Sequence, residues 1–267
     1  MPHSKKRWRP ITLTLTPPAD KATLMIGMIL AAGSGSRLRP VTDNIPKALA
    51  PLGDGTTILE RTLGNFAEVG ITEVVIVAGY RKEAIDDRRS EFETTYGLSI
   101  DVVFNDKAEV WNNAYSLWCA RSYFDSGFLL ANGDTLHPVS VEQTLLAQEP
   151  HDLRLAIDNV KVLGDEEMKV QTDGSGWLSR ITKLMEPTSA VGEYIGVTLV
   201  GPNFGAALSD ALEATFTRDP NLYYEDAYQE LVNRGHQVAL TPIGAVDWIE
   251  VDNLEDLERA KDIACRS

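Results

Sequence analysis

The sequence predicts an α/β fold: a doubly wound, mostly parallel sheet joined to a smaller half of mixed α+β structure. Two observations carry this prediction. Up to about residue 150, short apolar runs alternate with amphipathic segments, as strands alternate with helices around a parallel sheet. Beyond residue 150 the apolar runs are shorter and are separated by turn residues, which indicates hairpins. A chain of 267 residues is long enough to bury a sizeable core.

In the first half, the spacing of apolar residues predicts each element in turn. Ile58, Leu63 and Phe66 lie on one face of a helix that Gly70 ends, since glycine readily adopts the left-handed conformation found after helices. We expect strands at 24–30, 74–78, 100–104 and 128–131, with helices over 58–69, 82–95, 114–123 and 141–148.

In the second half, turn and capping residues mark the boundaries. Asp173-Gly174 is a hairpin signal between two short strands, and Asn253 is a suitable cap for a final helix, because its side chain accepts a hydrogen bond from the first turn. We expect strands at 153–159, 168–172, 177–183, 194–200, 238–242 and 248–251, and helices at 203–216, 225–233 and after Asn253.

Composition excludes several classes of protein. The chain is 43% hydrophobic and 24% charged, which is ordinary for a soluble enzyme and unlike a disordered chain. Lys and Arg number 25 against 39 Asp and Glu, a net charge of -14, which argues against nucleic acid as a partner. No apolar run reaches the length of a membrane span. The two cysteines are far apart in sequence, so the sequence predicts a cytoplasmic protein with reduced thiols.

Residues 1–23 differ from the rest and predict a flexible tail. They are basic and include Pro10, Pro17 and Pro18, which discourage a helix. Their apolar stretch is too short for a signal peptide. Two alternatives stay open: the segment lies upstream of the true start, Met25 or Met28, or it is a functional arm.

The strongest chemical signal is LAAGSGSRLRP at residues 30–40, followed by PKAL at residues 46–49. A loop of small residues after a strand brings backbone N–H groups against phosphate oxygens, and Arg37 and Lys47 add positive charge. The segment lacks the Gly-Lys-Ser/Thr of a Walker loop. The alternative is that this segment is an ordinary turn with cations on the protein surface and has no binding role. The candidate nucleotide contacts in this string are Leu30, Ala31, Ala32, Gly33, Gly35, Ser36 and Arg37.

These two motifs resemble the nucleotidyltransferases that activate sugar phosphates and similar monophosphates. The resemblance runs from about residue 25 to the C-terminus. It implies a Rossmann-like fold and a Mg²⁺-dependent nucleotidyl transfer that releases pyrophosphate, with Arg37 and Lys47 as catalytic residues. It also implies one nucleotidyltransferase domain over 24–267, made of a nucleotide-binding half (24–150) and an acceptor-binding half (151–267).

Two acidic residues fit the magnesium site that this resemblance implies. Asp134 and Asp252 each follow an apolar strand, and ligands of open α/β sheets collect at strand ends. Mg²⁺ prefers hard oxygen ligands and keeps several waters, so two carboxylates plus substrate phosphates suffice. The alternative for Asp252 is that it merely begins the last helix. Asp134 is also expected near the nucleotide.

Three further segments resemble one group within these nucleotidyltransferases. FNDK at 104–107, WNNAYSL at 111–117 and LYYED at 222–226 are similar to stretches of bacterial choline-phosphate cytidylyltransferases, and they add Asn113 to the nucleotide contacts. Trp111 and Tyr224 interchange aromatic types relative to that pattern. The segment ITKLMEP at 181–187 resembles a lysine–glutamate element that places a lysine near the acceptor phosphate.

An acceptor with a quaternary ammonium needs aromatic faces and carboxylates around it, because it has no N–H to donate. A primary amine relies more on the carboxylates. The alternative for each tyrosine is that it belongs to the core. The candidate acceptor contacts are Trp111, Tyr115, Lys183, Glu193, Tyr194, Tyr224 and Glu225.

The sequence therefore predicts a Mg²⁺-dependent cytidylyltransferase that joins CTP to a small amino- or choline-type phosphate or phosphonate, with phosphocholine expected first. One alternative is a sugar- or cyclitol-1-phosphate nucleotidyltransferase. Another is a regulatory subunit that binds nucleotide without catalysis, against which Arg37, Lys47, Asp134 and Asp252 argue together. A homodimer is compatible with the sequence, which does not fix the oligomeric state.

Overall fold

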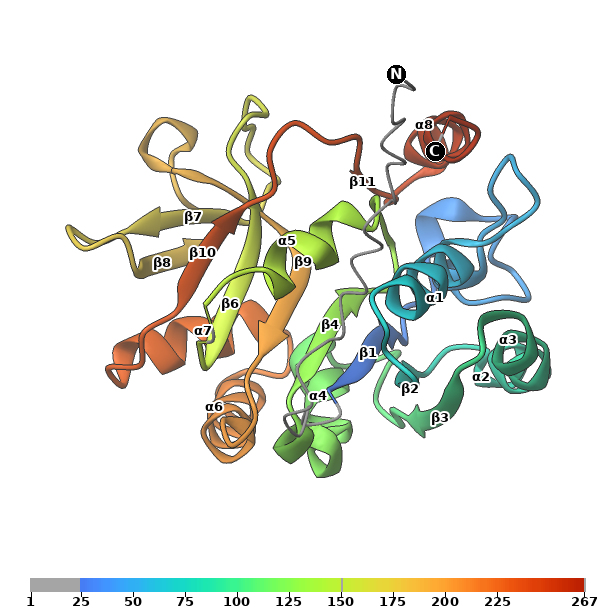
Figure 1. Ribbon diagram of the computed structural model, residues 1–267, viewed down its shortest axis with the longest axis horizontal. Helices are drawn as coiled ribbons and strands as arrows, with labels where there is room; N and C mark the ends of the chain where they lie inside the picture. The colour runs from blue at the N-terminus through green and yellow to red at the C-terminus, as the bar shows by residue number, and fades with distance from the viewer. Residues whose placement is uncertain (1–24, 150, 267) are drawn as a thin grey trace, which may run out of the picture.

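The computed structural model describes residues 25–149 and 151–266, and its centre is a large twisted sheet (Figure 1). Seven strands run in the order β10-β6-β9-β4-β1-β2-β3. Strands β4, β1, β2 and β3 are parallel, whereas β9 pairs antiparallel with both β4 and β6. The predicted mostly parallel α/β sheet is confirmed. These strands are β1 (Ile26–Ala31), β2 (Glu73–Ala78), β3 (Ser99–Phe104), β4 (Phe128–Asn132), β6 (Leu153–Asp158), β9 (Gly192–Val200) and β10 (Ala239–Pro242).

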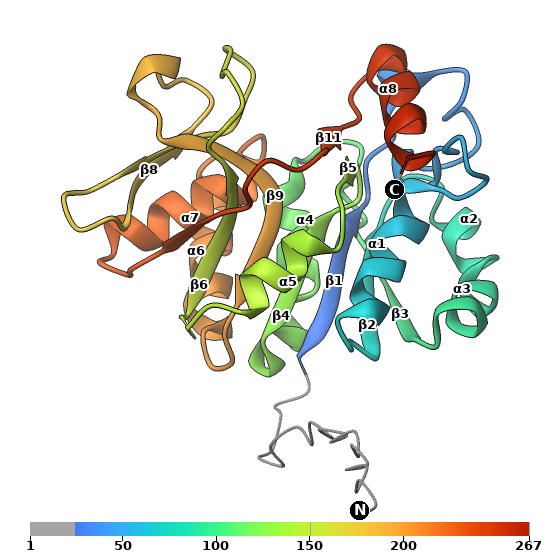
Figure 2. The same ribbon diagram turned by 45° about the horizontal axis from the view of Figure 1, so that its top comes forward.

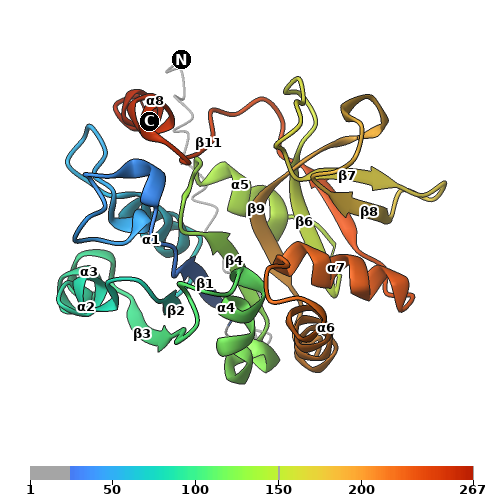
Figure 3. The same ribbon diagram turned by 180° about the vertical axis from the view of Figure 1, so that it is seen from behind.

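Helices cover both faces of the sheet. In Figure 1, α1 and α5 lie in front of the strands, and Figure 3 shows α4, α6 and α7 on the opposite face. Among the described residues, none of the helices has both the length and the apolar character needed to cross a bilayer. The helices are α1 (Ile58–Glu68), α2 (Lys82–Asp86), α3 (Arg89–Tyr96), α4 (Asn113–Cys119), α5 (Ser140–Leu146), α6 (Gly205–Arg218), α7 (Tyr224–Asn233) and α8 (Leu254–Ala264).

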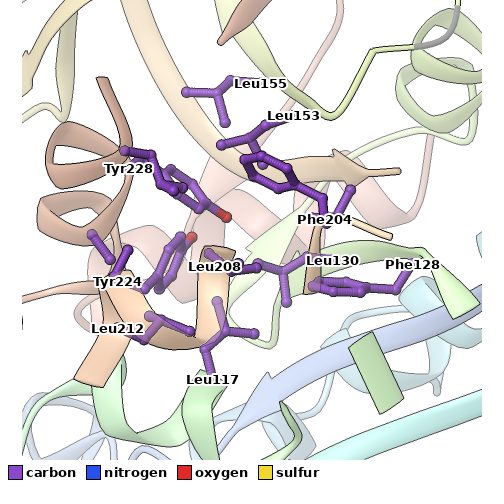
Figure 4. Packing of buried hydrophobic residues seen from close by; sticks show 14 of the residues in the cluster. Leu117, Phe128, Leu130, Leu153, Leu155, Phe204, Leu208, Leu212, Tyr224 and Tyr228 are labelled. Atoms are coloured by element: carbon purple, nitrogen blue, oxygen red, sulfur yellow. The ribbon is translucent and has the colours of Figure 1, made fainter. Parts of the chain in front are cut away.

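The two largest apolar clusters lie one on each face of the sheet, and a third, smaller cluster lies between α8 and the paired strands Thr135–Leu136 and Ile249–Glu250. Alternate residues of a strand point to opposite faces, so Val75 and Val77 of β2 join the layer under α4, α6 and α7, whereas Val74 and Ile76 join the layer under α1 and α5. Strands that bury both faces are typical of parallel sheets. Figure 4 shows the first layer, in which Leu208, Leu212, Tyr224 and Tyr228 meet the strands.

Two small pairings complete the second half. Strands β7 (Lys169–Thr172) and β8 (Leu178–Thr182) form a hairpin, as the Asp173-Gly174 signal predicted. Strand β11 (Ile249–Glu250) pairs antiparallel with β5 (Thr135–Leu136). Figure 2 shows the chain returning along β11 to the side of β5 before α8 begins. The last strand of the second half therefore lies against the first half.

The structure differs from the predicted elements in two places. The single helix expected over 82–95 is two helices that meet at Asp87 and Arg88, both of which keep near-helical dihedral angles. The helix expected over 114–123 ends at Cys119 and continues as a 3₁₀ segment, Arg121–Ser126. The tail predicted for residues 1–23 lies outside the described residues.

Asn253 caps α8 as predicted, and replacing it by alanine should weaken the fold. Its side-chain oxygen accepts hydrogen bonds from the backbone N–H groups of Glu255 and Asp256. Loss of such a cap typically costs about 1 kcal/mol, so we expect Asn253→Ala to lower the free energy of unfolding by that amount in a urea titration. Asn253→Ser, which keeps an acceptor oxygen, is the matched control and should lose less. Equal losses in both variants would contradict the capping role.

Candidate active site

The glycine-rich loop begins where β1 ends and presents unused backbone donors. Within the described part of the chain, the N–H groups of Gly33, Ser34 and Gly35 donate no hydrogen bond. The loop is held by Thr42, whose hydroxyl donates to the Gly35 carbonyl at 2.7 Å, and by the Lys47 N–H, which donates to the Gly33 carbonyl. Gly35 has φ +59°, a left-handed conformation that favours glycine. Adjacent free N–H groups of this kind bind anions.

Lys47 lies beside this loop, at the start of a 3₁₀ turn, Lys47–Leu49. Its ammonium donates to Asp134 Oδ2 at 2.8 Å and to Asp252 Oδ1 at 2.7 Å, and the side chain is 12% exposed. Burial alone would lower the pKa of Lys47, but the two carboxylates raise it above its usual value. The side chain is therefore a permanent cation held between two acids.

Three carboxylates meet at this point because β11 pairs with β5. The Val251 N–H donates to the Asp134 carbonyl at 2.8 Å, which brings Asp252 beside Asp134. Ligand oxygens of Asp134, Glu250 and Asp252 all lie within 4.8 Å of one another. Partial burial raises the pKa of Asp252, but Lys47 and Arg37 lower it below its usual value, with Arg37 at 3.2 Å. Desolvation and the charges of Asp134 and Asp252 raise the pKa of Glu250 to about 7.

A cavity of about 340 Å³ joins the loop, the carboxylates and the second half of the chain. Most of the sequence-predicted site residues line this one cavity. They are Leu30, Ala32, Gly33, Gly35, Ser36, Arg37, Lys47, Asn113, Asp134, Lys183, Tyr194, Glu225 and Asp252.

The end of the cavity formed by the second half combines a cation, a carboxylate and two tyrosines. Lys183 lies over the ring of Tyr223, with Nζ 5.5 Å from the ring centroid. Among the described residues, no carboxylate comes within 4 Å of this ammonium. Glu225 is 6% exposed. Burial, followed by the charges of Glu250 and Asp226, raises the pKa of Glu225 to about 8.

A match to a protein-family model assigns this chain to a family. The model described as "Nucleotidyl transferase" matches residues 26–169, more than half of the chain. This chain belongs to the nucleotidyl transferase family. The match begins with β1 and includes the glycine-rich loop, Lys47 and Asp134, so one end of the cavity described above belongs to the matched segment.

Several known proteins are similar to this nucleotidyl transferase. The CMP-5'-(3-aminopropyl)phosphonate synthase of Streptomyces rubellomurinus is 28% identical, over 87% of this chain and 38% of its own length. The choline-phosphate cytidylyltransferase of Streptococcus pneumoniae is 37% identical, over 40% of this chain and 43% of its own length. This chain thus spans less than half of the length of either relative in these alignments.

Solved structures agree on the fold. The inositol-1-phosphate CTP transferase of T. maritima superposes with a TM-score of 0.77, at 23% identity, and covers 91% of this chain and 96% of that one. The sheet order and the helical layers described above are therefore those of a nucleotidyl transferase.

Five of the sequence-predicted residues lie outside the cavity wall of this nucleotidyl transferase. Ala31 faces the apolar layer under α1, because it alternates with Leu30 and Ala32 along the strand. Glu193 points away from its neighbour Tyr194, and its carboxylate accepts from Lys161 at 2.9 Å. The remaining three are the aromatic residues Trp111, Tyr115 and Tyr224.

Tyr224 is a core residue, and Trp111 and Tyr115 are partly buried and pack against the core. Trp111 and Tyr115 pack edge-on with ring centroids 5.0 Å apart, and both contact Phe216 of α6. Tyr224 is fully buried, and its hydroxyl donates to Asn132 Oδ1 at 2.8 Å. None of the three residues lines the cavity, so none of the rings presents its face to a ligand there.

Among the cavity residues that sequence reasoning missed are Asn132 and Glu250. Each stands two positions before a predicted metal ligand, Asp134 or Asp252. Residues at i and i+2 of a strand share a face, so this spacing was a usable signal in both places. The third carboxylate of the cluster is thus marked in the sequence by the motif Glu250-Val251-Asp252.

Gly35→Ala should impair this nucleotidyl transferase through Lys47. A Cβ at Gly35 would lie 2.9 Å from the Cβ of Lys47, too close for real atoms, so the lysine backbone has to shift. Since a displacement of 1 Å at a reacting centre can cost about 10²-fold in rate, we expect turnover to fall by about 10- to 100-fold.

Gly55→Ala is the matched control. Gly55 also has positive φ, but an added Cβ meets nothing within 4 Å. It therefore carries the same backbone cost without touching Lys47. We expect a small loss of stability and near-normal steady-state turnover in this control. Equal turnover in the two variants would show that the contact with Lys47 is unimportant.

Proposed function

We propose that this nucleotidyl transferase is a cytidylyltransferase that joins CTP to a small amino- or choline-type phosphate or phosphonate. The observation that carries the proposal is the single cavity. One end holds the glycine-rich loop, Lys47 and the carboxylate cluster. The other holds a buried carboxylate and a lysine that forms no ion pair with the described residues. The first end suits a triphosphate, and the second suits a small acceptor with an anionic and a cationic group.

The proposed step is an in-line displacement at the α-phosphorus of CTP. An oxygen of the acceptor phosphate or phosphonate forms the new bond, and the bond from the α-phosphorus to the bridging oxygen breaks, so that its electron pair leaves with pyrophosphate. The acceptor oxygen is already anionic, so the step needs no general base. Catalysis therefore depends on positioning two anions and offsetting their repulsion.

The residues of the chain divide this work between them. The free N–H groups of Gly33, Ser34 and Gly35, with the Arg37 guanidinium, hold the triphosphate. Lys47 stabilises the charge that builds up as the second anion approaches. Lys183, which faces the cavity without a carboxylate partner, binds the acceptor anion.

The carboxylate cluster fits Mg²⁺. Asp134, Glu250 and Asp252 supply three hard oxygen ligands within reach of one another, which is the donor set that Mg²⁺ prefers. A magnesium ion bound there would neutralise charge on the α-phosphate and on the leaving pyrophosphate. Arg37 and Lys47 hold the two aspartates in place beside the glycine-rich loop.

The choice of cytidine rests on the resemblance to cytidylyltransferases. The names of all three similar proteins described above refer to a CMP product, a cytidylyltransferase or CTP. Those proteins differ in their acceptors: an aminopropylphosphonate, a choline phosphate and an inositol phosphate. A cyclitol or sugar 1-phosphate is therefore the second candidate, favoured by the amides of Asn112, Asn113 and Asn132 at the cavity wall.

One panel of reactions tests the proposal. Each of the four nucleoside triphosphates is incubated with Mg²⁺ and with phosphocholine, aminoalkylphosphonates or sugar 1-phosphates, and pyrophosphate release is measured. We expect release with CTP and an amino- or choline-type acceptor. Release with sugar or cyclitol 1-phosphates alone would favour the second candidate, and release that requires another nucleotide would overturn the choice of cytidine.

A further inference from the structure

Glu225 is a buried carboxylate at the cavity wall with an unsatisfied oxygen. The first residues of α7 bring it there, and its Oε2 has no hydrogen-bond partner among the described residues. No Lys, Arg or His of the described chain lies within ion-pair distance of it. A buried polar atom without a partner is costly. Burial, followed by the charges of Glu250 and Asp226, raises the pKa of Glu225, although the charge of Lys183 acts in the opposite direction. The cavity therefore offers a ligand a deep hydrogen-bond acceptor.

The same end of the cavity is poor in open aromatic faces. Trp111, Tyr115 and Tyr224 do not line the cavity, as described above. Tyr194 is 3% exposed, and its hydroxyl is bonded to Thr198 and to Tyr224. Tyr223 is more open, but the ammonium of Lys183 already lies over its ring. A second cation on that face would meet like charge. The aromatic cage that a quaternary ammonium requires is therefore missing at this wall.

We propose that Glu225 selects an acceptor that carries a primary ammonium group, by accepting a hydrogen bond from that group at Oε2. The inference rests on the proposed function and narrows its acceptor to aminoalkyl phosphates and phosphonates, in preference to phosphocholine. The ammonium has N–H groups that satisfy the buried oxygen. Its positive charge also favours the ionised form of Glu225, with which it then pairs. A trimethylammonium has no N–H, and its methyl groups would leave Oε2 desolvated and still unpaired. Lys183 holds the anionic end of the same acceptor.

The test compares three acceptors of similar size. They are 2-aminoethylphosphonate, its N-trimethyl analogue, and propylphosphonate, in which a methyl group replaces the ammonium. Hydrogen bonds to charged groups contribute enough free energy for about 10- to 100-fold in binding, so we expect the native chain to prefer the amine over both others by that factor in kcat/KM. A native chain that uses the trimethyl analogue as well as the amine overturns the inference.

Glu225→Gln is the decisive variant, because it keeps the shape of the side chain and removes the charge. We expect the KM for 2-aminoethylphosphonate to rise by about 10- to 100-fold, while the KM for CTP and the rate with propylphosphonate change little. Calorimetric titration of the amine in the presence of α,β-methylene CTP should show the same loss without turnover. An equal loss with all three acceptors would show that Glu225 is only structural, and overturns the inference.

Asp226→Asn is the matched control. Asp226 is the next carboxylate along α7, its side chain accepts from the Tyr223 N–H at 2.8 Å, and it does not line the cavity. The control removes the same charge one residue away, and we expect it to keep the preference for the amine. If Asp226→Asn also lost the preference for the amine, the preference would depend on the overall negative charge of this region and not on a contact with Glu225. That result would overturn the inference.

The two proposals fail in different ways. Turnover of CTP with phosphocholine but without a preference for the primary amine overturns the role of Glu225 and leaves the cytidylyltransferase standing. An absence of pyrophosphate release with CTP and every amino- or choline-type acceptor overturns both.

Discussion

Asp134→Ala and Asp252→Ala are each expected to lower turnover by about 10³-fold, since a catalytic metal ion contributes several kcal/mol to transition-state stabilisation. Each change removes a proposed magnesium ligand from the cluster in which the carboxylate oxygens lie within 4.8 Å of one another. The measurement is steady-state pyrophosphate release over a range of Mg²⁺ concentrations, beside a urea titration of each variant. Both variants should unfold close to the native midpoint, because the two side chains are partly exposed.

Asp247→Ala is the control for these variants. Asp247 lies on the same connection just before β11, but its side chain is 77% exposed, and its one ion pair among the described residues is with Arg266, at 4.0 Å. It should keep native turnover at every Mg²⁺ concentration. If either cluster variant retained near-normal turnover at limiting Mg²⁺, the assignment of the metal ligands would be wrong.

Lys47→Ala should lower turnover by about 10²- to 10³-fold, or roughly 3–4 kcal/mol, which is typical for loss of one electrostatic contact to a transition state. Binding of CTP should weaken much less, because the loop N–H groups and Arg37 remain. The charge of Lys47 is needed most when the second anion approaches the α-phosphorus, so its contribution grows toward the transition state. The test is steady-state kinetics together with direct titration of CTP.

Lys47→Arg separates charge from shape. The Lys47 ammonium donates to two carboxylates, at 2.7 Å and 2.8 Å, and a planar guanidinium does not reproduce that compact point charge. We therefore expect only partial rescue of turnover. An alanine variant with unchanged turnover and a large rise in the dissociation constant of CTP would show that Lys47 serves binding alone.

The elements predicted from sequence depend on local signals, and the structure follows those signals closely. Gly70 adopts positive φ after α1, and Asn253 caps α8, because glycine and asparagine suit these positions whatever the rest of the chain does. The pairing of β5 with β11 was not predicted. It involves two residues on each side, too few for a periodic pattern, and it exists only because two distant segments meet.

The sequence also did not predict whether the aromatic side chains point into the cavity or pack against other side chains. A motif with several aromatic residues suits an open ligand cage and a packed layer alike. Trp111 and Tyr115 turn inward because Phe216, a hundred positions further on, packs against both of them. The strand-end rule was more informative for charged residues: it selected Asp134 and Asp252, and the structure places both within hydrogen-bond distance of Lys47.

The short pairing of β5 with β11 also determines at which stage of folding the carboxylate cluster forms. Lys47 and Asp252 are 205 positions apart, and closing so long a segment costs entropy that their contact has to repay. Contacts between distant residues also form slowly. The glycine-rich loop, by contrast, folds from neighbours of β1. During synthesis, an emerging chain therefore acquires its loop, Lys47 and Asp134 early, but 205 further positions after Lys47 have to be made before Asp252 can complete the cluster.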